Sequence, residues 1–146
     1  MQIFESSSDE IDFNDAFFET SKSDYPNFDT WTIKCSNEKR KTWHVKDNQG
    51  LCALIMLKEE TFLTSQVNGH LLKICLFKVS SEHRKKGLGS ELLSLAIEYA
   101  KKRDADWVYA TLFEKYEDML TFFLAKGFRV LNQRNERNEI LVVKKL

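Results

Sequence analysis

The apolar residues between positions 87 and 103 recur every three to four positions. This period matches the turn of an α-helix and predicts an amphipathic helix with one apolar face. The cations Lys101, Lys102 and Arg103 follow at its end, where the helix dipole favours positive charge. The predicted apolar stripe consists of Leu88, Leu92, either Leu95 or Ala96, and Tyr99, widened by Leu93, Ile97 and Ala100.

The rest of the chain alternates between helical and strand-like patterns. Helical spacing predicts three more helices, at 13–20, 27–38 and 116–126. Apolar runs between turn residues predict strands at 2–5, 41–46, 51–58, 71–79, 107–113, 128–132 and 139–145. Turns are expected at "DNQG" (47–50) and "NGH" (68–70). This order predicts an α/β (α+β) fold, with a mixed, mostly antiparallel central sheet of about seven strands flanked by about four helices.

Composition and charge narrow the class of protein. A chain of 146 residues with one proline, no repeat and no polar linker is expected to form a single domain over residues 1–146. Lysine plus arginine equals aspartate plus glutamate at 22 each, so the neutral net charge argues against a nucleic-acid partner. No run of 18 apolar residues occurs, and the polar start does not resemble a signal peptide, so we expect no membrane partner.

The cysteines and histidines suggest neither a disulfide framework nor a metal site. Three cysteines without a C-x-x-C pair are read as free thiols in a reducing compartment, which predicts a cytoplasmic protein. The histidines show no metal-ligand spacing with them, so no metal is expected. These residues are Cys35, Cys52, Cys75, His44, His70 and His83.

The stretch "HRKKGLGSELL" (83–93) places cations and two glycines just before the predicted helix. A helix amino terminus offers unpaired N–H groups, and glycine allows a ligand to approach the backbone closely, so this arrangement predicts an anion site. The alternative is a simple turn with a solvated basic run. Two nucleotide-binding fingerprints fail, because Glu82 and Leu92 occupy positions where they need glycine. The remaining pattern is Arg84-x-x-Gly87-x-Gly89.

This pattern, between an apolar strand and an amphipathic helix, resembles the acyl-CoA-binding signature of the GNAT superfamily of N-acetyltransferases. "FFLAKGF" (122–128) resembles that family's F-Y-x-x-x-G-F segment. The two matches and the strand order cover about residues 71–146, whereas the amino-terminal half fits the fold with less diagnostic residues. The resemblance implies a splayed pair of strands, "KICLFKV" and "WVYATLF", with the thioester of acetyl-CoA between them.

The resemblance also implies how acetyl-CoA, the co-substrate, would be held. Backbone amides of the turn would bind the pyrophosphate, and the end of the preceding strand would bind the pantetheine arm. An N–H group near Phe77 would face the thioester oxygen, which gains negative charge during the reaction. The implied binding residues are Phe77, Lys78, Val79, Arg84, Lys85, Lys86, Gly87, Leu88, Gly89, Ser90 and Phe123.

One residue departs from the family pattern. The family tyrosine that protonates the leaving sulfur corresponds to Phe123, which has no proton to donate. Tyr116 is the candidate acid nearest in sequence, although seven residues span about 10 Å of helix, and it also suits a core or rim position. Glu114 is the candidate base, with a solvated loop glutamate as the alternative. Cys75 lies either near the thioester or in the packed core.

Three functions therefore compete. The first is an N-acetyltransferase that transfers acetyl to a primary amine of a small molecule or a protein; a homodimer is left open. The second is a non-catalytic acyl-CoA-binding or interaction module, which Phe123 keeps in play. The third is a nucleic-acid binder that uses the basic turn, against which the net charge argues. The acidic residues Asp12, Asp15, Asp24 and Asp29 suit either a cationic acceptor or a solvated surface.

Overall fold

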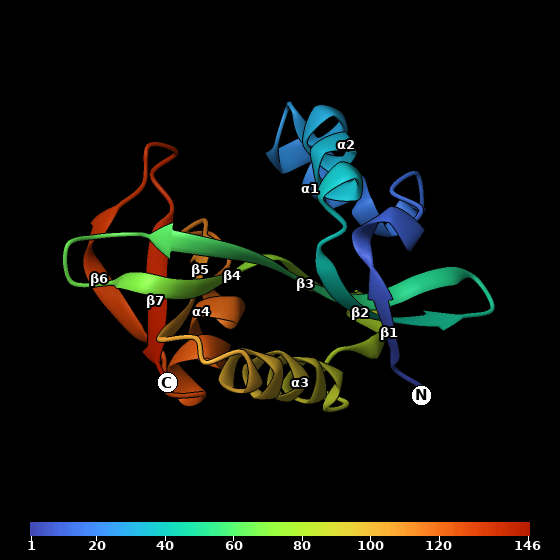
Figure 1. Ribbon diagram of the computed structural model, residues 1–146. Helices are drawn as coiled ribbons and strands as arrows, with labels where there is room; N and C mark the ends of the chain where they lie inside the picture. Colours follow the sequence, from blue (N-terminus) through green and yellow to red (C-terminus); the bar gives the residue numbers. More distant parts are fainter. The chain divides into compact units, whose positions relative to one another are not determined.

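The computed structural model describes all 146 residues and has the predicted mixed α/β architecture (Figure 1). The strands are β1 (Phe4–Ser7), β2 (Lys41–Asp47), β3 (Gly50–Phe62), β4 (Asn68–Val79), β5 (Trp107–Leu112), β6 (Arg129–Arg134) and β7 (Ile140–Lys145). The α-helices are α1 (Glu19–Asp24), α2 (Phe28–Glu38), α3 (Leu88–Lys102) and α4 (Glu117–Ala125), with 3-10 turns η1 (Ser8–Glu10), η2 (Ala16–Phe18) and η3 (Ser81–His83). The seven strands form one sheet in the order β1-β2-β3-β4-β5-β7-β6, which confirms the predicted fold class.

The chain divides into two compact units by its internal contacts. The first comprises residues 1–57 and 76–96, and the second comprises residues 58–75 and 97–146. Strands β3 and β4 and helix α3 each pass from one unit into the other. No helix in the chain is long and apolar enough to cross a membrane.

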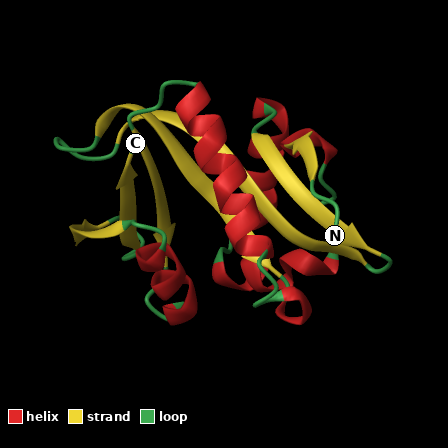
Figure 2. Cartoon of the chain, turned by 90° about the horizontal axis from the view of Figure 1, so that it is seen from below, coloured by secondary structure: helices red, strands yellow, loops and turns green.

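The first unit packs helices against the strands of the amino-terminal half. Antiparallel pairing joins β1 to β2 and β2 to β3. Figures 1 and 2 show α1 and α2 on one side of these strands and α3 on the other. The first half of α3 buries Leu88, Leu92, Leu93 and Ala96, so Ala96 rather than Leu95 continues the predicted stripe. Burial of this apolar face holds the first half of α3 against the rest of the unit, and this positions the turn that precedes the helix.

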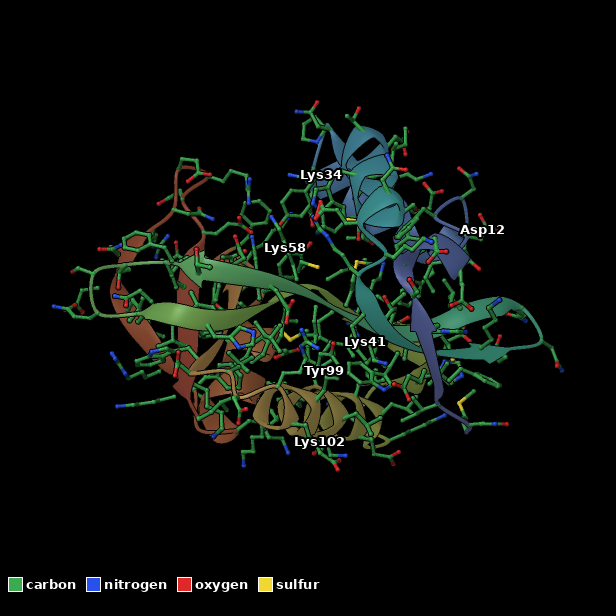
Figure 3. The ribbon with its side chains drawn as sticks, in the orientation of Figure 1. Asp12, Lys34, Lys41, Lys58, Tyr99 and Lys102 are labelled. Atoms are coloured by element: carbon green, nitrogen blue, oxygen red, sulfur yellow. The ribbon has the colours of Figure 1, made fainter.

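The second unit contains the carboxyl-terminal strands. Strand β5 pairs in parallel with β4 and antiparallel with β7, and β7 pairs with β6. Val67, in the loop before β4, forms a buried apolar cluster with Leu71, Tyr109 and Val143 of β4, β5 and β7. At the end of α3, Tyr99 is half-buried, whereas the Lys102 side chain is 73% exposed and pairs with Glu98 at 3.2 Å (Figure 3). This matches the amphipathic helix expected from the sequence.

The helix predicted at 13–20 is wrong in its position. The Asp15 carboxylate accepts a hydrogen bond from the Phe17 N–H (2.9 Å), and the next residues form the 3-10 turn η2. A short polar side chain that captures a nearby N–H competes with the helix in this way. The α-helix begins only at Glu19 and includes residues expected to separate two helices. Phe18 is fully buried and contacts Phe28, with ring centroids 5.8 Å apart.

The turn predicted at "NGH" is also wrong, because these residues already belong to β4. The chain reverses earlier, where the Thr64 hydroxyl accepts a hydrogen bond from the Val67 N–H (3.0 Å). The Asp106 carboxylate accepts the His70 N–H at 2.8 Å, and a Cβ at Gly69 would lie 2.5 Å from that carboxylate. This glycine therefore makes room for the exposed Asp106 side chain rather than for a reversal of the chain.

Candidate functional site

Residues 80–90 connect β4 to α3 and include the first three residues of that helix. This segment is named the signature turn. The Ser80 N–H donates to the Cys52 carbonyl (2.8 Å) and the His83 N–H donates to the Ser80 carbonyl (3.0 Å), which attaches the start of the turn to β3. The backbone then alternates, because Lys85 has a φ of 63° and Gly87 a φ of 85°, while Lys86 between them has no positive φ. Alternating backbone conformations aim successive N–H groups at one point and form an anion-binding concavity.

The amino terminus of α3 adds further donors to the signature turn. The first hydrogen bond of the helix runs from the Glu91 N–H to the Gly87 carbonyl (3.0 Å). The preceding N–H groups, from Leu88 to Ser90, have no carbonyl four residues earlier within the helix. A Cβ built on Gly87 meets no atom within 4 Å, so a ligand can approach the backbone here. The helix dipole favours a negative group at this point.

The charged side chains of the signature turn are exposed. Arg84, Lys85 and Lys86 all lie at the surface. The Arg84 Nε donates to the Val79 carbonyl at 3.0 Å, which joins the turn to the end of β4. Backbone N–H dipoles and three exposed cations therefore occupy the same turn, as the sequence predicted. Their binding to a ligand stays a prediction.

Strand β4 is longer than its parallel pairing with β5. The parallel register ends at Ile74 and Ala110, whereas β4 continues to Val79. Phe77, Lys78 and Val79 are half-buried. The binding of a pantetheine arm to the backbone of these residues stays a prediction.

Lys78 has a partner within the chain. Its Nζ donates to the Phe17 carbonyl and lies 5.0 Å from the centre of the Phe17 ring. Burial, followed by the charge of Arg84, lowers the pKa of the Lys78 ammonium. Side chains alternate along a strand, so Phe77 and Val79 point to the opposite face. The Lys78 side chain is thus engaged within the chain, and the predicted role of this residue in binding acetyl-CoA stays a prediction.

The β5–α4 junction, residues 113–116, holds the two candidate catalytic side chains. Glu114 is 77% exposed and pairs with Arg134 on β6 at 3.3 Å. Tyr116 is half-buried just before α4, with the Lys115 ammonium 5.2 Å from its ring centre. Phe123, on α4, is 2% exposed and packs against Phe128 with ring centroids 4.9 Å apart. Its ring is therefore a core side chain, and its predicted contact with acetyl-CoA stays a prediction.

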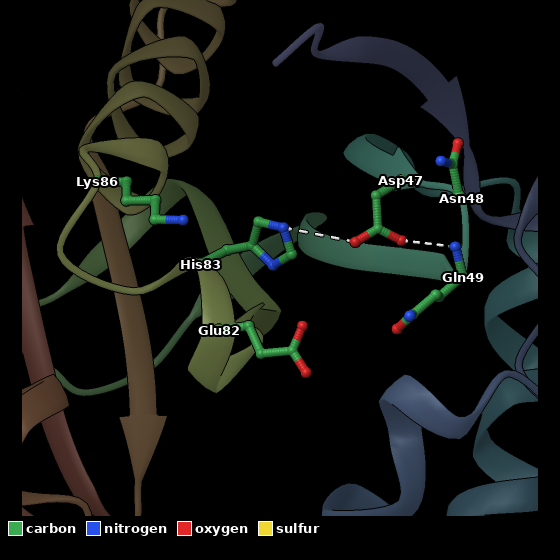
Figure 4. Close-up of a pocket in the computed structure, with 6 residues that line it drawn as sticks. All are labelled: Asp47, Asn48, Gln49, Glu82, His83 and Lys86. Atoms are coloured by element: carbon green, nitrogen blue, oxygen red, sulfur yellow. Dashed lines mark hydrogen bonds and ion pairs between the residues drawn. The ribbon is translucent and has the colours of Figure 1, made fainter.

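A polar pocket beside the signature turn was not predicted from the sequence. The pocket has a volume of about 280 Å³ and is lined by Asp47, Asn48, Gln49, Glu82, His83 and Lys86. Figure 4 shows His83 facing Asp47, with Glu82 and Lys86 around them. No spacing in the sequence connects a hairpin turn with the end of β4, so the only hint was the mixed acidic and basic composition of "SSEHRKK".

Comparisons with known proteins agree with this architecture. The chain resembles Arabidopsis thaliana NAA60 in complex with a bisubstrate analogue (16% identity, 99% of this chain and 98% of that chain, TM-score 0.73). It also resembles the PaiA N-acetyltransferase of Thermoplasma acidophilum in complex with coenzyme A (15% identity, 100% of both chains, TM-score 0.70). A GNAT family acetyltransferase from Elizabethkingia anophelis with acetyl-CoA bound is similar as well (16% identity, 99% and 97%, TM-score 0.68). At these identities the likeness concerns the fold.

The family itself is identified from the sequence. A search of curated protein sequences finds no match. The model of the Acetyltransferase (GNAT) family, however, matches residues 7–128, which include the signature turn and "FFLAKGF". This match supports acyl-CoA-dependent acetyl transfer in general and leaves the acceptor open. The chain belongs to the GNAT family of acetyltransferases.

Proposed function

We propose that the protein is an N-acetyltransferase that moves the acetyl group of acetyl-CoA to a primary amine of a small molecule or a protein. The observation that carries the proposal is the signature turn, where alternating φ values, an open glycine and a helix amino terminus meet three exposed cations. This combination suits a pyrophosphate, which carries its charge on several oxygens. The family assignment and the coenzyme-bound neighbours support the identity of that pyrophosphate.

Binding is proposed to depend mainly on the backbone. The N–H groups from Gly87 to Ser90 would hold the pyrophosphate, with Arg84, Lys85 and Lys86 adding charge. The backbone at the end of β4 would hold the pantetheine arm, and an N–H near Phe77 would stabilise the thioester oxygen. We further propose that residues 1–146 act as one domain, because β3, β4 and α3 pass through both units. The free cysteines support a reducing compartment such as the cytoplasm.

The proposed chemistry is a direct transfer. The neutral amine nitrogen attacks the thioester carbonyl carbon, the carbon–sulfur bond breaks, and the sulfur leaves as a thiolate or takes a proton. Tyr116 is proposed as the acid, because it is half-buried and carries a hydroxyl. Glu114 is proposed as the base that accepts the amine proton through water, since its carboxylate is largely solvated. A metal has no role in this scheme.

A second candidate function follows from Phe123. Its buried ring at the family's tyrosine position leaves the binding turn intact and removes the usual acid. A protein that binds acyl-CoA without transferring the acetyl group would show these two features together. In that case the protein would bind acyl-CoA or a partner without catalysing acetyl transfer.

Two measurements separate these functions. Isothermal titration with acetyl-CoA, and with ATP and NAD as controls, tests the site; thiol release from acetyl-CoA in the presence of a set of amines tests the transfer. We expect selective binding of acetyl-CoA and release of thiol with at least one amine. Binding without release for any amine would favour the binding module. An absence of binding would overturn both.

A further inference from the structure

Three potential metal ligands from different elements converge beside the signature turn. Asp47 ends β2, Cys52 lies on β3, and His83 ends η3, all within the first compact unit. The carboxylate, thiol and imidazole atoms of these residues all lie within 4.8 Å of one another. We infer that Asp47, Cys52 and His83 form a binding site for a divalent transition-metal ion of the Zn²⁺ type. The inference goes beyond the proposed transferase function and does not rest on it.

The distance between two of the ligands suits a shared ion. His83 Nε2 and Asp47 Oδ2 are 3.4 Å apart (Figure 4). An N–H···O hydrogen bond is usually 2.7–3.2 Å long, so this pair is loosely spaced for a direct bond. Two N and O ligands of one tetrahedral Zn²⁺ lie about 3.3 Å apart, as follows from metal–ligand lengths of about 2.0 Å. The Cys52 thiol donates to the Val45 carbonyl (3.4 Å), and it would exchange this weak hydrogen bond for the ion to complete three corners of the tetrahedron.

Two of the three ligands have hydrogen-bond partners of the kind that orient metal ligands. His83 Nδ1 lies 2.8 Å from the Ser80 hydroxyl, so in the tautomer that binds through Nε2 its Nδ1–H donates to Ser80. The other carboxylate oxygen of Asp47 accepts the Gln49 N–H at 2.8 Å. Such outer partners orient metal ligands and raise their affinity. Cys52 is 1% exposed, so its sulfur is shielded from solvent on the protein side.

Charge and access agree with the same ion. A thiolate and a carboxylate together neutralise a divalent cation, which lowers the free energy of placing it in a partly buried site. The side chains of His83 and Asp47 are 13% and 28% exposed, so the site opens toward the polar pocket of about 280 Å³. Water from this pocket can occupy a fourth position. A mixed S, N and O ligand set favours Zn²⁺ over Mg²⁺ or Ca²⁺.

Titration with Co²⁺ tests this site, because a Co²⁺–thiolate bond gives an intense near-ultraviolet charge-transfer band. The experiment uses the full chain without acetyl-CoA, so its outcome is independent of the transferase proposal. We expect one Co²⁺ per chain, the charge-transfer band, and displacement of Co²⁺ by Zn²⁺. Cys52→Ser should lose the band, whereas Cys35→Ser and Cys75→Ser, which change the other two free thiols, should keep it.

Two further variants keep the test decisive if Cys52→Ser does not fold. Asp47→Asn changes a partly exposed carboxylate and should weaken Co²⁺ binding at least tenfold while the protein stays folded in thermal unfolding. Ser80→Ala should weaken it by about tenfold through the orientation of the imidazole. A wild-type protein without the band, or a Cys52→Ser variant that retains it, would overturn the site. Unchanged affinity in both Asp47→Asn and Ser80→Ala would do the same.

Discussion

The signature turn is proposed to bind acetyl-CoA, and the β5–α4 junction is proposed to transfer protons. The two regions use different chemical groups for these roles. In the signature turn the proposed contacts come from backbone N–H groups. The residue type matters most at Gly87, because its φ of 85° favours glycine. At the junction the proposed chemistry needs particular side chains, and the family's tyrosine is replaced by the buried Phe123. We therefore expect a site made of backbone groups to tolerate substitutions that a site made of side chains does not.

The physical reason lies in what each role requires. Backbone donors are present in every residue, so a phosphate site survives most substitutions that preserve the turn and the helix. Proton transfer requires a group of suitable pKa within hydrogen-bonding distance of the reacting atom. Tyr116 is the half-buried hydroxyl at the junction, and Glu114 is solvated beside Arg134. We therefore expect substitutions in the signature turn to lower acetyl-CoA affinity by a larger factor than substitutions at the junction lower kcat.

The largest effect is expected for Gly87→Val. A β-branched residue at φ 85° is strained, and its side chain would enter the open space above the turn, where the pyrophosphate would lie. We expect acetyl-CoA affinity to fall by about a hundredfold or more, equivalent to about 3 kcal/mol, in isothermal titration. The strain should lower the free energy of unfolding by about 1–2 kcal/mol.

A control separates binding from folding in that variant. Gly127 has a φ of 88° but lies after α4, outside the signature turn. Gly127→Ala should therefore lower stability through a similar backbone strain without weakening acetyl-CoA binding. Wild-type affinity in Gly87→Val would show that acetyl-CoA binds elsewhere. The proposed role of the signature turn would then be wrong.

The next effect in size is expected for Tyr116→Phe, which removes only the proposed acid. The maximal rate kcat should fall by about tenfold or more, at the lower end of general acid catalysis, with no change in the Kd of acetyl-CoA. Steady-state kinetics measure this fall in kcat. Glu114→Gln is the companion variant, and we expect a loss of only about two- to fivefold because water can take over from a solvated base. An unchanged kcat in Tyr116→Phe would mean that the thiolate leaves without this acid.

Phe123→Tyr restores the family residue and should help little. The ring is 2% exposed and packed against Phe122 and Phe128, so an added hydroxyl enters an apolar environment. Burying a hydroxyl without a partner lowers the free energy of unfolding by about 1–3 kcal/mol. We expect denaturant unfolding to show that loss and kcat to change by less than about twofold, since the rest of the junction is unaltered. A tenfold gain in kcat would instead show that the hydroxyl reaches the leaving sulfur.

The same contrast explains what the sequence could predict. Helix α3 was predicted within one residue at each end, because its apolar period is strong and its start is set by glycines. The fold class followed from the order of such patterns. The helix at 13–20 was misplaced because the Asp15 carboxylate captures a backbone N–H, and no periodicity reveals that. The turn at "NGH" failed because Gly69 serves the distant side chain of Asp106.

The site was predictable in the same uneven way. The glycine and cation pattern located the signature turn, because backbone conformation there depends on neighbouring residues. Nothing in the sequence indicated that His83 would face Asp47 or that Cys52 would lie near both, because these residues lie on three elements separated by up to 36 positions. Convergence of side chains over such distances depends on the tertiary fold.

The smallest effect on stability is expected for Lys85→Gly, which separates the shape of the signature turn from its charge. Lys85 has a φ of 63°, a conformation that costs a non-glycine residue about 1–2 kcal/mol, while glycine adds about 0.5–1 kcal/mol of unfolded-state entropy. The variant should therefore gain about 0.5–1 kcal/mol in the free energy of unfolding. Because the backbone donors remain and one exposed cation is lost, acetyl-CoA affinity should fall only about two- to fivefold, less so at high salt. Lys85→Gln, which keeps the strain and removes the charge, should show the same loss of affinity without the gain in stability. A hundredfold loss in both variants would assign the binding to the Lys85 side chain, and the signature turn would then depend on side chains as the β5–α4 junction does.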